Sequence, residues 1–287
     1  MFTGFFIFWH IKLYQKIPEE NIFVISSTSP RKSKSKSKNE TVSLLTEGLV
    51  YVGKGTKYFL VEDKDDVDFY SEIYSISTNE EIIDRRIPMV FIPTSIKEKS
   101  GGKTVVESWV TKLKDSGLSL LIHGIIDEDA GNTPVNGVFK ISRYSIENYL
   151  VDPIITYAAL MDKDLHNQII DVNLKIGEEY KLKSLGDEEL QTIADAMFDK
   201  VQTNIQHSFP DFDATVDSRK VEVTFINNHI LLYPSWIIKR RGKTILNEAY
   251  NQTFNSSIIN HKSLFKALRK IKFIPKELCI FLDNARR

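Results

Sequence analysis

The chain has 287 residues, of which 42% are apolar, so it is long enough to bury a sizeable core in one large domain or in a core domain with a smaller one appended. Its 38 basic and 38 acidic residues give a formal net charge of zero, so overall charge gives no argument for a nucleic-acid partner. The single cysteine, Cys279, excludes a disulfide framework and a cluster of thiolate metal ligands, as is typical of proteins in a reducing cytoplasm.

Residues 1–44 differ in pattern from the rest of the chain. The aromatic run from Phe5 to Trp9 is too short to span a bilayer and lacks the basic leader and cleavage site of a signal peptide. We therefore expect a cytoplasmic protein without membrane association. Serines and lysines alternate from Ser29 to Asn39, which predicts a flexible linker. The same basic run could also act as an arm that contacts phosphates, and the two interpretations are compatible.

Residues 45–155 alternate between apolar runs of strand length and amphipathic helices. We predict strands at 49–52, 58–61, 88–92, 119–126 and 139–142, and helices at 65–74 and 104–113. This alternation implies right-handed crossovers and a mostly parallel sheet flanked by helices, which is an α/β fold. Residues 156–287 predict a helix-rich α+β region, with helices at 186–206, 242–254 and 261–271, a strand at 220–226 and a small hairpin.

Acidic side chains follow two of these predicted strands. Glu62 ends the run at 58–61, and Asp127 and Asp129 follow the run at 119–126. Ligand sites in parallel sheets lie at the carboxyl ends of the strands, so these acids should converge. In extended geometry Asp127 and Asp129 point the same way and repel each other unless a cation lies between them. Oxygen ligands of this kind suit Mg²⁺ or Mn²⁺.

Two further acids lie close to this group in the pattern. Asp66 follows Glu62 by one helical turn, and Glu147 follows the strand at 139–142. Each acid also has a structural interpretation. Glu62 and Asp66 could cap a helix, Glu147 could begin one, and the Asp-x-Asp pair could lie in a solvated loop.

Basic residues near these segments are candidates for contacts with phosphate. Arg143 precedes the segment SIENYL and could hold a carboxylate or a phosphate. Arg240, Arg241 and Lys243 surround a glycine before a predicted helix, where they either bind phosphate or form a solvated basic edge. The histidines are scattered and predict no ligand set, and the glycines near residue 53 lack P-loop spacing, so we expect no nucleotide hydrolysis.

The segments VEDKDDVDFY, GGKTVVESWV, GIIDEDAGN and SIENYL, in this order and spacing, resemble the TOPRIM-like domain of defence-associated nucleases. That family includes the OLD-type nucleases and the effector partners of ATPase sensors in phage-defence systems such as PARIS and AbiL. The resemblance covers roughly residues 45–155. The chain departs from the family at Asp63, where many relatives have glycine after the first glutamate.

The resemblance implies hydrolysis of phosphodiester bonds with two bound Mg²⁺ or Mn²⁺ ions. Glu62, Asp66, Asp127 and Asp129 match the metal positions of the motif, and Glu147 is a candidate for the second ion. Lys103 in the GGK turn is the candidate for neutralising developing charge, and Lys64 is the runner-up.

The resemblance also implies partners. The substrate is nucleic acid, with RNA, including transfer RNA, favoured over DNA, and an ABC-type ATPase sensor subunit controls the toxic activity in antiphage defence. A homodimer is compatible with this assembly. Lys64, Arg143, Arg240, Arg241 and Lys243 are the expected nucleic-acid contacts. The alternative is a TOPRIM-like binding or scaffold subunit without catalysis.

Overall fold

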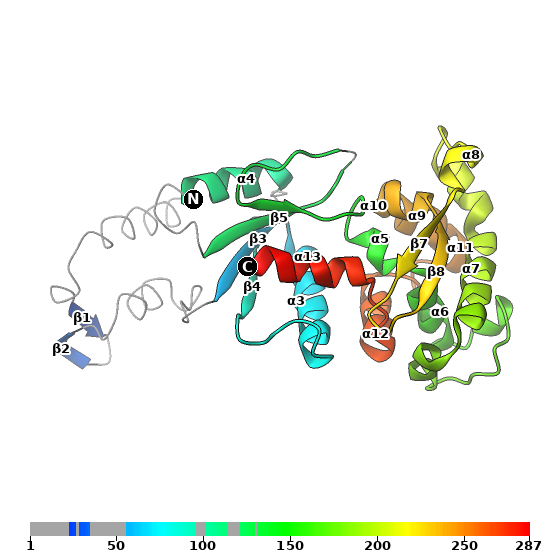
Figure 1. Cartoon of the computed structure of the whole chain (residues 1–287), viewed down its shortest axis with the longest axis horizontal. Coiled ribbons are helices and arrows are strands. Elements are labelled where there is room, and N and C mark those ends of the chain that lie inside the picture. Colours follow the sequence, from blue (N-terminus) through cyan, green and yellow to red (C-terminus); the bar gives the residue numbers. More distant parts are fainter. Residues whose placement is uncertain (1–22, 27–28, 35–55, 96–101, 114–120, 130) are drawn as a thin grey trace.

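The computed structural model describes residues 23–26, 29–34, 56–95, 102–113, 121–129 and 131–287. A four-stranded sheet has the strand order β4-β3-β5-β6. Its strands are β3 (Lys57–Val61), β4 (Met89–Pro93), β5 (Ile122–Ile126) and β6 (Val138–Lys140). Every neighbouring pair is parallel, so the predicted α/β fold with a parallel sheet is confirmed (Figure 1).

Helices cover both faces of this sheet because its central strand is apolar on both sides. Phe59 and Val61 of β3 belong to the main hydrophobic cluster, whereas Leu60 belongs to a second cluster. The helix α3 (Lys64–Asn79) packs in the first cluster and α4 (Gly102–Leu113) in the second. At Gly124 of β5, an added Cβ would lie 2.7 Å from a methyl group of Val106, so glycine permits the close approach of α4.

The helix-rich region follows β6. Its longer helices are α6 (Pro153–Met161), α7 (Asp187–Ser208), α12 (His261–Ile271) and α13 (Lys276–Arg286), and its short ones are α5 (Glu147–Leu150), α8 (Ala214–Asp217), α9 (Trp236–Lys239), α10 (Gly242–Thr244) and α11 (Asn251–Phe254), with 3₁₀ turns at His166–Gln168 and Glu179–Ser184. The predicted hairpin consists of β7 (Lys220–Thr224) and β8 (Ile230–Pro234). The helix predicted at 242–254 is interrupted, because residues Ile245–Tyr250 form a π-helix between α10 and α11.

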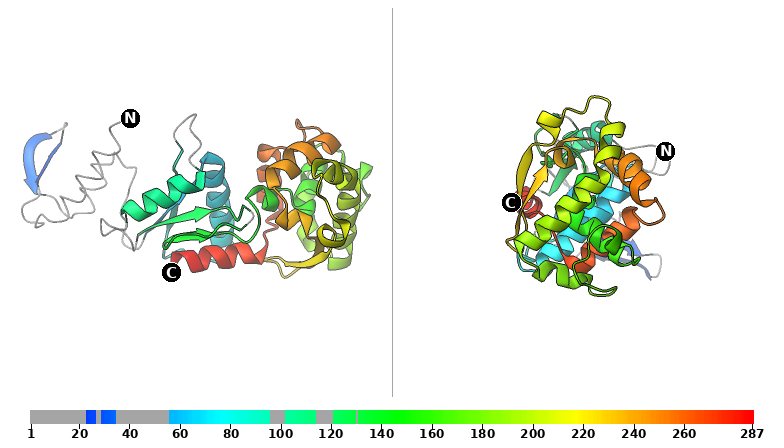
Figure 2. Two further views of the ribbon diagram at one scale, coloured as in Figure 1. Left: turned by 90° about the horizontal axis from the view of Figure 1, so that it is seen from above. Right: turned by 90° about the vertical axis from the view of Figure 1, so that its right-hand side faces the viewer.

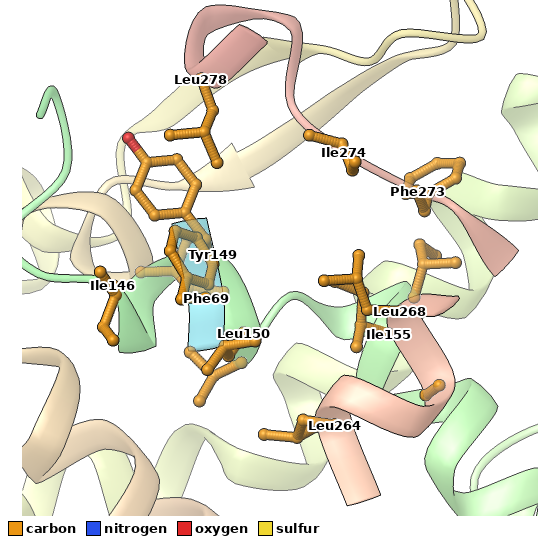
Figure 3. Packing of buried hydrophobic residues seen from close by; sticks show 14 of the residues in the cluster. Phe69, Ile146, Tyr149, Leu150, Ile155, Leu264, Leu268, Phe273, Ile274 and Leu278 are labelled. Carbon is orange, nitrogen blue, oxygen red and sulfur yellow. The ribbon is translucent and has the colours of Figure 1, made fainter. Parts of the chain in front are cut away.

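The sheet and the helix-rich region share one core. Figure 3 shows Phe69 of α3 and Tyr149 of α5 in the same cluster as Leu264 of α12 and Leu278 of α13. The expected division near residue 155 falls inside α6, which packs against α7 and α12. The last helix then returns to the sheet region (Figure 2), where Ser77 Oγ lies 3.1 Å from Cys279 Sγ.

The N-terminal segment is described in part. Residues Phe23–Ser26 (β1) and Ser29–Lys34 (β2) form an antiparallel pair, so half of the run expected as a linker is a strand. The remainder of that run and the strand predicted at 49–52 lie outside the described residues. Among the helices in the described ranges, none is both long and apolar enough to cross a membrane.

A buried carboxyl group joins α6 to the hairpin. Asp152 is fully buried and caps α6, since its Oδ1 accepts a hydrogen bond from the Ile154 amide at 2.9 Å. Its Oδ2 accepts a hydrogen bond from the Tyr233 hydroxyl at 3.0 Å. Burial raises the pKa of Asp152 from its ordinary value of 3.8 to about 6, although nearby Arg143 opposes the rise.

This raised pKa predicts a pH-dependent loss of stability. The folded state holds the proton of Asp152 more tightly than the unfolded state, so its contribution is complete below about pH 4 and is lost as pH rises through 6. At about 1.4 kcal/mol per pH unit between the two pKa values, the loss reaches up to about 3 kcal/mol. We expect Asp152→Asn, which retains a capping side chain, to lose less stability than the natural chain between pH 4 and 7 in denaturant titrations.

The matched control is Asp213→Asn, which alters the exposed N-cap of α8. The free energy of unfolding of this variant should change with pH as that of the natural chain does across the same range. Equal pH dependence of the Asp152→Asn variant and the natural chain would contradict the role assigned to Asp152.

Candidate metal centre

The chain turns from β3 into α3 through two aspartates. Asp63 is the N-cap of α3, and its side chain accepts hydrogen bonds from the amides of Asp65 at 2.8 Å and Asp66 at 3.2 Å. In return, Asp66 Oδ2 accepts hydrogen bonds from the amides of Glu62 at 3.0 Å and Asp63 at 3.1 Å. Asp63 therefore makes the turn between β3 and α3, and it uses its carboxylate to do so.

Glu62 directly follows β3 at the carboxyl edge of the sheet. Its Oε1 is buried and has no hydrogen-bond partner. Burial raises its pKa, and the charges of Asp129 and Asp63 raise it further. An orphaned buried carboxylate oxygen is costly unless a ligand satisfies it, so Glu62 is poised to accept one.

Asp127 and Asp129 follow the neighbouring strand β5. Burial raises the pKa of Asp127 well above its ordinary value, and Asp66, Glu62 and Glu147 add to the rise. The expected extended geometry between the two aspartates is wrong, because Asp129 has a φ of 41° in the left-handed region. Its amide donates a hydrogen bond to the Tyr144 carbonyl at 3.1 Å, and this turn keeps Asp129 close enough to affect Glu62.

Glu147 begins α5 and is 1% exposed. The Ser145 hydroxyl donates a hydrogen bond of 2.6 Å to its Oε2. Its Oε1 lies 3.8 Å from His261 Nε2 and 4.0 Å from Lys243 Nζ. One oxygen of Glu147 is therefore held by Ser145, while the other faces nitrogen atoms from α10 and α12.

These side chains form one acidic cluster, defined as Glu62, Asp66, Asp127, Asp129 and Glu147. The pKa of Asp66 rises to about 7, first through burial and then through Asp63, with Glu62 and Glu147 contributing. Mutual repulsion of this kind is relieved by protons or by a cation. The oxygen ligands and the orphaned Glu62 oxygen fit a hard divalent ion, although no three such groups in the described ranges already surround one point.

A basic segment, defined as residues 239–243, borders this cluster. Gly242 packs so tightly that an added Cβ would lie 2.4 Å from Asn148 Oδ1 and 2.9 Å from the Asn148 amide nitrogen. Asn148 Nδ2 donates hydrogen bonds of 2.8 Å to the carbonyls of Ile237 and Arg240. The carboxylates of Glu147 and its neighbours outweigh the effect of burial and raise the pKa of Lys243, so this lysine is charged beside the cluster.

Two expected nucleic-acid contacts are instead used within the fold. Arg143 is fully buried, where its Nε donates a hydrogen bond of 2.8 Å to Glu277 and its Nη1 one of 2.9 Å to the Asn148 carbonyl. Arg240 forms ion pairs with Asp217 at 2.7 Å and Asp211 at 2.6 Å. These guanidinium groups already have acidic partners. Arg241, in contrast, is exposed, and its charge lowers the pKa of Asp129, opposing the rise that burial causes.

Lys103 and Lys64, the two lysines expected near the site, lie in different surroundings from Lys243. Lys103 Nζ donates a hydrogen bond of 2.9 Å to Asn132, which in turn bonds the Asp127 carbonyl at 3.1 Å. Lys103 thus adjoins the cluster through one intervening side chain. Lys64 is exposed and pairs with Asp68 on the outer surface of α3. Lys243 is the lysine whose charge opposes the raised pKa values of Glu62 and Asp129.

His261 is the site residue that the sequence pattern did not single out. Its Nδ1 lies 3.5 Å from Asp65 Oδ2, and its Nε2 lies 3.8 Å from Glu147 Oε1. The Nε2 atom is buried and has no hydrogen-bond partner. No local signal marks this histidine, because α12 brings it to the cluster only through tertiary packing.

Comparisons with known proteins add no family assignment. No protein-family model matches the chain, and no curated protein matches it. Functional inference therefore rests on the residues of this chain.

The contact at Gly242 predicts a specific intolerance to a methyl group. In Gly242→Ala the Cβ meets a backbone atom of Asn148 that cannot move freely, so we expect a loss of about 1–3 kcal/mol in the free energy of unfolding. Gly186→Ala is the matched control, because its nearest contact would be 3.7 Å. Denaturant titration measures both variants, and equal losses would contradict the predicted crowding.

The raised pKa values predict pH-dependent binding of divalent cations. A cation binds the deprotonated carboxylates, and Asp66, with a pKa of about 7, releases its proton only near neutral pH. We therefore expect Mg²⁺ or Mn²⁺ to raise Tm more at pH 8 than at pH 6. Glu62→Gln should abolish this difference. Glu128→Gln should retain it, since Glu128 pairs with Lys140 at 3.2 Å. A rise in Tm that is the same at both pH values and in the Glu62→Gln variant would contradict cation binding at this cluster.

Proposed function

We propose that the chain is a metal-dependent nuclease of the TOPRIM-like kind that hydrolyses phosphodiester bonds. The observation that carries the proposal is the convergence of the acidic cluster at the carboxyl edge of a parallel sheet, with Lys243 and Arg241 beside it. Carboxylates alone repel a phosphate, so a site that pairs them with cationic groups suits a metal-bound phosphate substrate.

The residues divide into two roles. Glu62, Asp127 and Asp129 are the proposed ligands of one ion, and Glu147 with Asp66 supports a second. Bound Mg²⁺ or Mn²⁺ would supply an activated water and stabilise the leaving oxygen. Lys243 and Arg241 neutralise charge on the phosphate, which replaces the role first expected of Lys103. His123, which packs between Phe59 and Phe139, has no role in this proposal.

Substrate and partner follow from the resemblance. We propose RNA, including transfer RNA, ahead of DNA, and control by an ABC-type ATPase sensor in antiphage defence. The single cysteine supports a cytoplasmic location. A binding subunit without catalysis is the outcome that the following experiment would reveal if the proposal fails.

The test compares the natural chain with Glu62→Gln in the presence of Mg²⁺ or Mn²⁺. The purified proteins are incubated with RNA and DNA, and the new ends are sequenced. We expect cleavage by the natural chain and a rate lower by more than about 1000-fold for the variant, because an ion ligand is lost. Intact substrate with the natural chain, or equal cleavage by both proteins, would overturn the proposal.

The basic segment supplies a second pair of variants for the same assay. Lys243→Ala should lower the rate by roughly 100-fold, as expected when a group that stabilises transition-state charge is removed. Lys239→Ala is the matched control, because Lys239 is exposed and lies four residues earlier in the same basic stretch. Similar losses for the two variants would show that general charge, and not the placement of Lys243, matters.

A further inference from the structure

A pocket of about 530 Å³ lies between α3 and α12. Its lining residues are Asp65, Asp68, Ser71, Glu72, His261, Lys262, Phe265 and Arg269. The volume lies within the range of small-molecule sites, which is about 300–1,000 Å³. Neither the sequence motifs nor the proposed catalytic mechanism assigns a role to this pocket.

The pocket adjoins the acidic cluster through one shared side chain. His261 lines the pocket, and its Nε2 lies 3.8 Å from Glu147. Asp65 also lines the pocket. It belongs to the first turn of α3, next to Asp66 of the acidic cluster. A polynucleotide with its scissile phosphate at the cluster therefore has the adjoining nucleotide within reach of this pocket.

The charges on the α3 side of the pocket favour a base over a phosphate. Its acidic side chains are paired, Glu72 with Arg269 at 2.6 Å and Asp65 with His261 at 3.5 Å, while Asp68 pairs with Lys64. Paired carboxylates still accept hydrogen bonds from the amino groups of a base but disfavour an anion.

The remaining lining groups complement a nucleotide. Phe265 is partly buried, with its ring centroid 6.4 Å from that of Phe69, and it presents an aromatic surface. Lys262 is exposed on the preceding turn of α12. An aromatic ring beside an exposed lysine is the combination that binds unpaired bases and their phosphates.

We propose that this pocket holds an unpaired nucleotide next to the bond that is cleaved, with its base against Phe265 and a phosphate at Lys262. The inference rests on the proposed nuclease function and adds to it that the substrate is single-stranded at this position. A base can enter the pocket only when it is released from the stack of a duplex.

The experiment measures binding separately from cleavage. The Glu62→Gln chain is mixed with fluorescently labelled single-stranded RNA, single-stranded DNA and duplexes of the same sequence, and Kd is measured by fluorescence anisotropy. Single strands should bind more tightly than duplexes. Adding Phe265→Ala should weaken single-strand binding by roughly 5- to 100-fold, the range for losing one base-stacking contact. Phe265→Leu, which preserves apolar packing in the core, should show a similar loss while Tm stays near that of the parent.

The lysines of α12 provide the control. Lys262→Ala should weaken binding and reduce its dependence on salt, since a phosphate contact is lost. Lys266→Ala should leave binding unchanged, because Lys266 lies one turn further along and pairs with Asp162 at 2.7 Å. Equal affinities for single strands and duplexes, or no effect of the Phe265 variants, would overturn the pocket while cleavage by the natural chain still supports the nuclease. Pocket-dependent binding without any cleavage would instead overturn the nuclease.

Discussion

The side chain of Asn148 fastens the α5 segment, which follows the sheet, to the chain around α9 and α10. Its amide nitrogen atom donates to two carbonyls around the basic segment, and its oxygen accepts from the Ser145 amide at 2.9 Å. Gly242 leaves no space for a methyl group at this contact. Because Ser145 also holds Glu147, the same few bonds place Glu147 next to Lys243, with Glu147 Oε1 4.0 Å from Lys243 Nζ.

Around this junction the fold gathers the five carboxyl groups of the acidic cluster, with Lys243 and Arg241 beside them. The strands β3 and β5 end side by side, and the acids that follow them raise one another's pKa. Asp63 and Asp66 use part of their hydrogen-bonding capacity to begin α3, whereas the buried Glu62 oxygen remains without a partner. Buried polar atoms are usually hydrogen-bonded, so an unpaired carboxylate oxygen within a cluster of acids is a candidate position for a ligand.

Local signals predicted much of this arrangement. The apolar runs of β3 and β5 identify buried strands, and parallel topology then brings Glu62 and Asp127 to one edge. The helix α12 was predicted with its observed bounds, His261–Ile271. These features depend on neighbouring residues and on the general geometry of sheets.

Other features depend on contacts between distant parts of the chain. The sequence alone could not distinguish Arg143, which is buried against Glu277, from Arg241, which is exposed near Asp129. It could not select Lys243 over Lys103, or bring His261 to Glu147, because packing of the helix-rich region decides these placements. The left-handed conformation of Asp129 likewise could not be predicted, because the position is not occupied by glycine, the residue that usually indicates such a turn.

The ion pair between Arg143 and Glu277 has a consequence for synthesis on the ribosome. Glu277 follows Arg143 by 134 residues, so at about 5–20 residues per second it is made roughly 7–27 s later. During that interval the acids of the sheet edge have been synthesised, but the α13 carboxylate that pairs with Arg143 has not. A nascent chain therefore carries the acidic cluster before it carries Glu277, so the contact between α13 and Arg143 forms only late in translation.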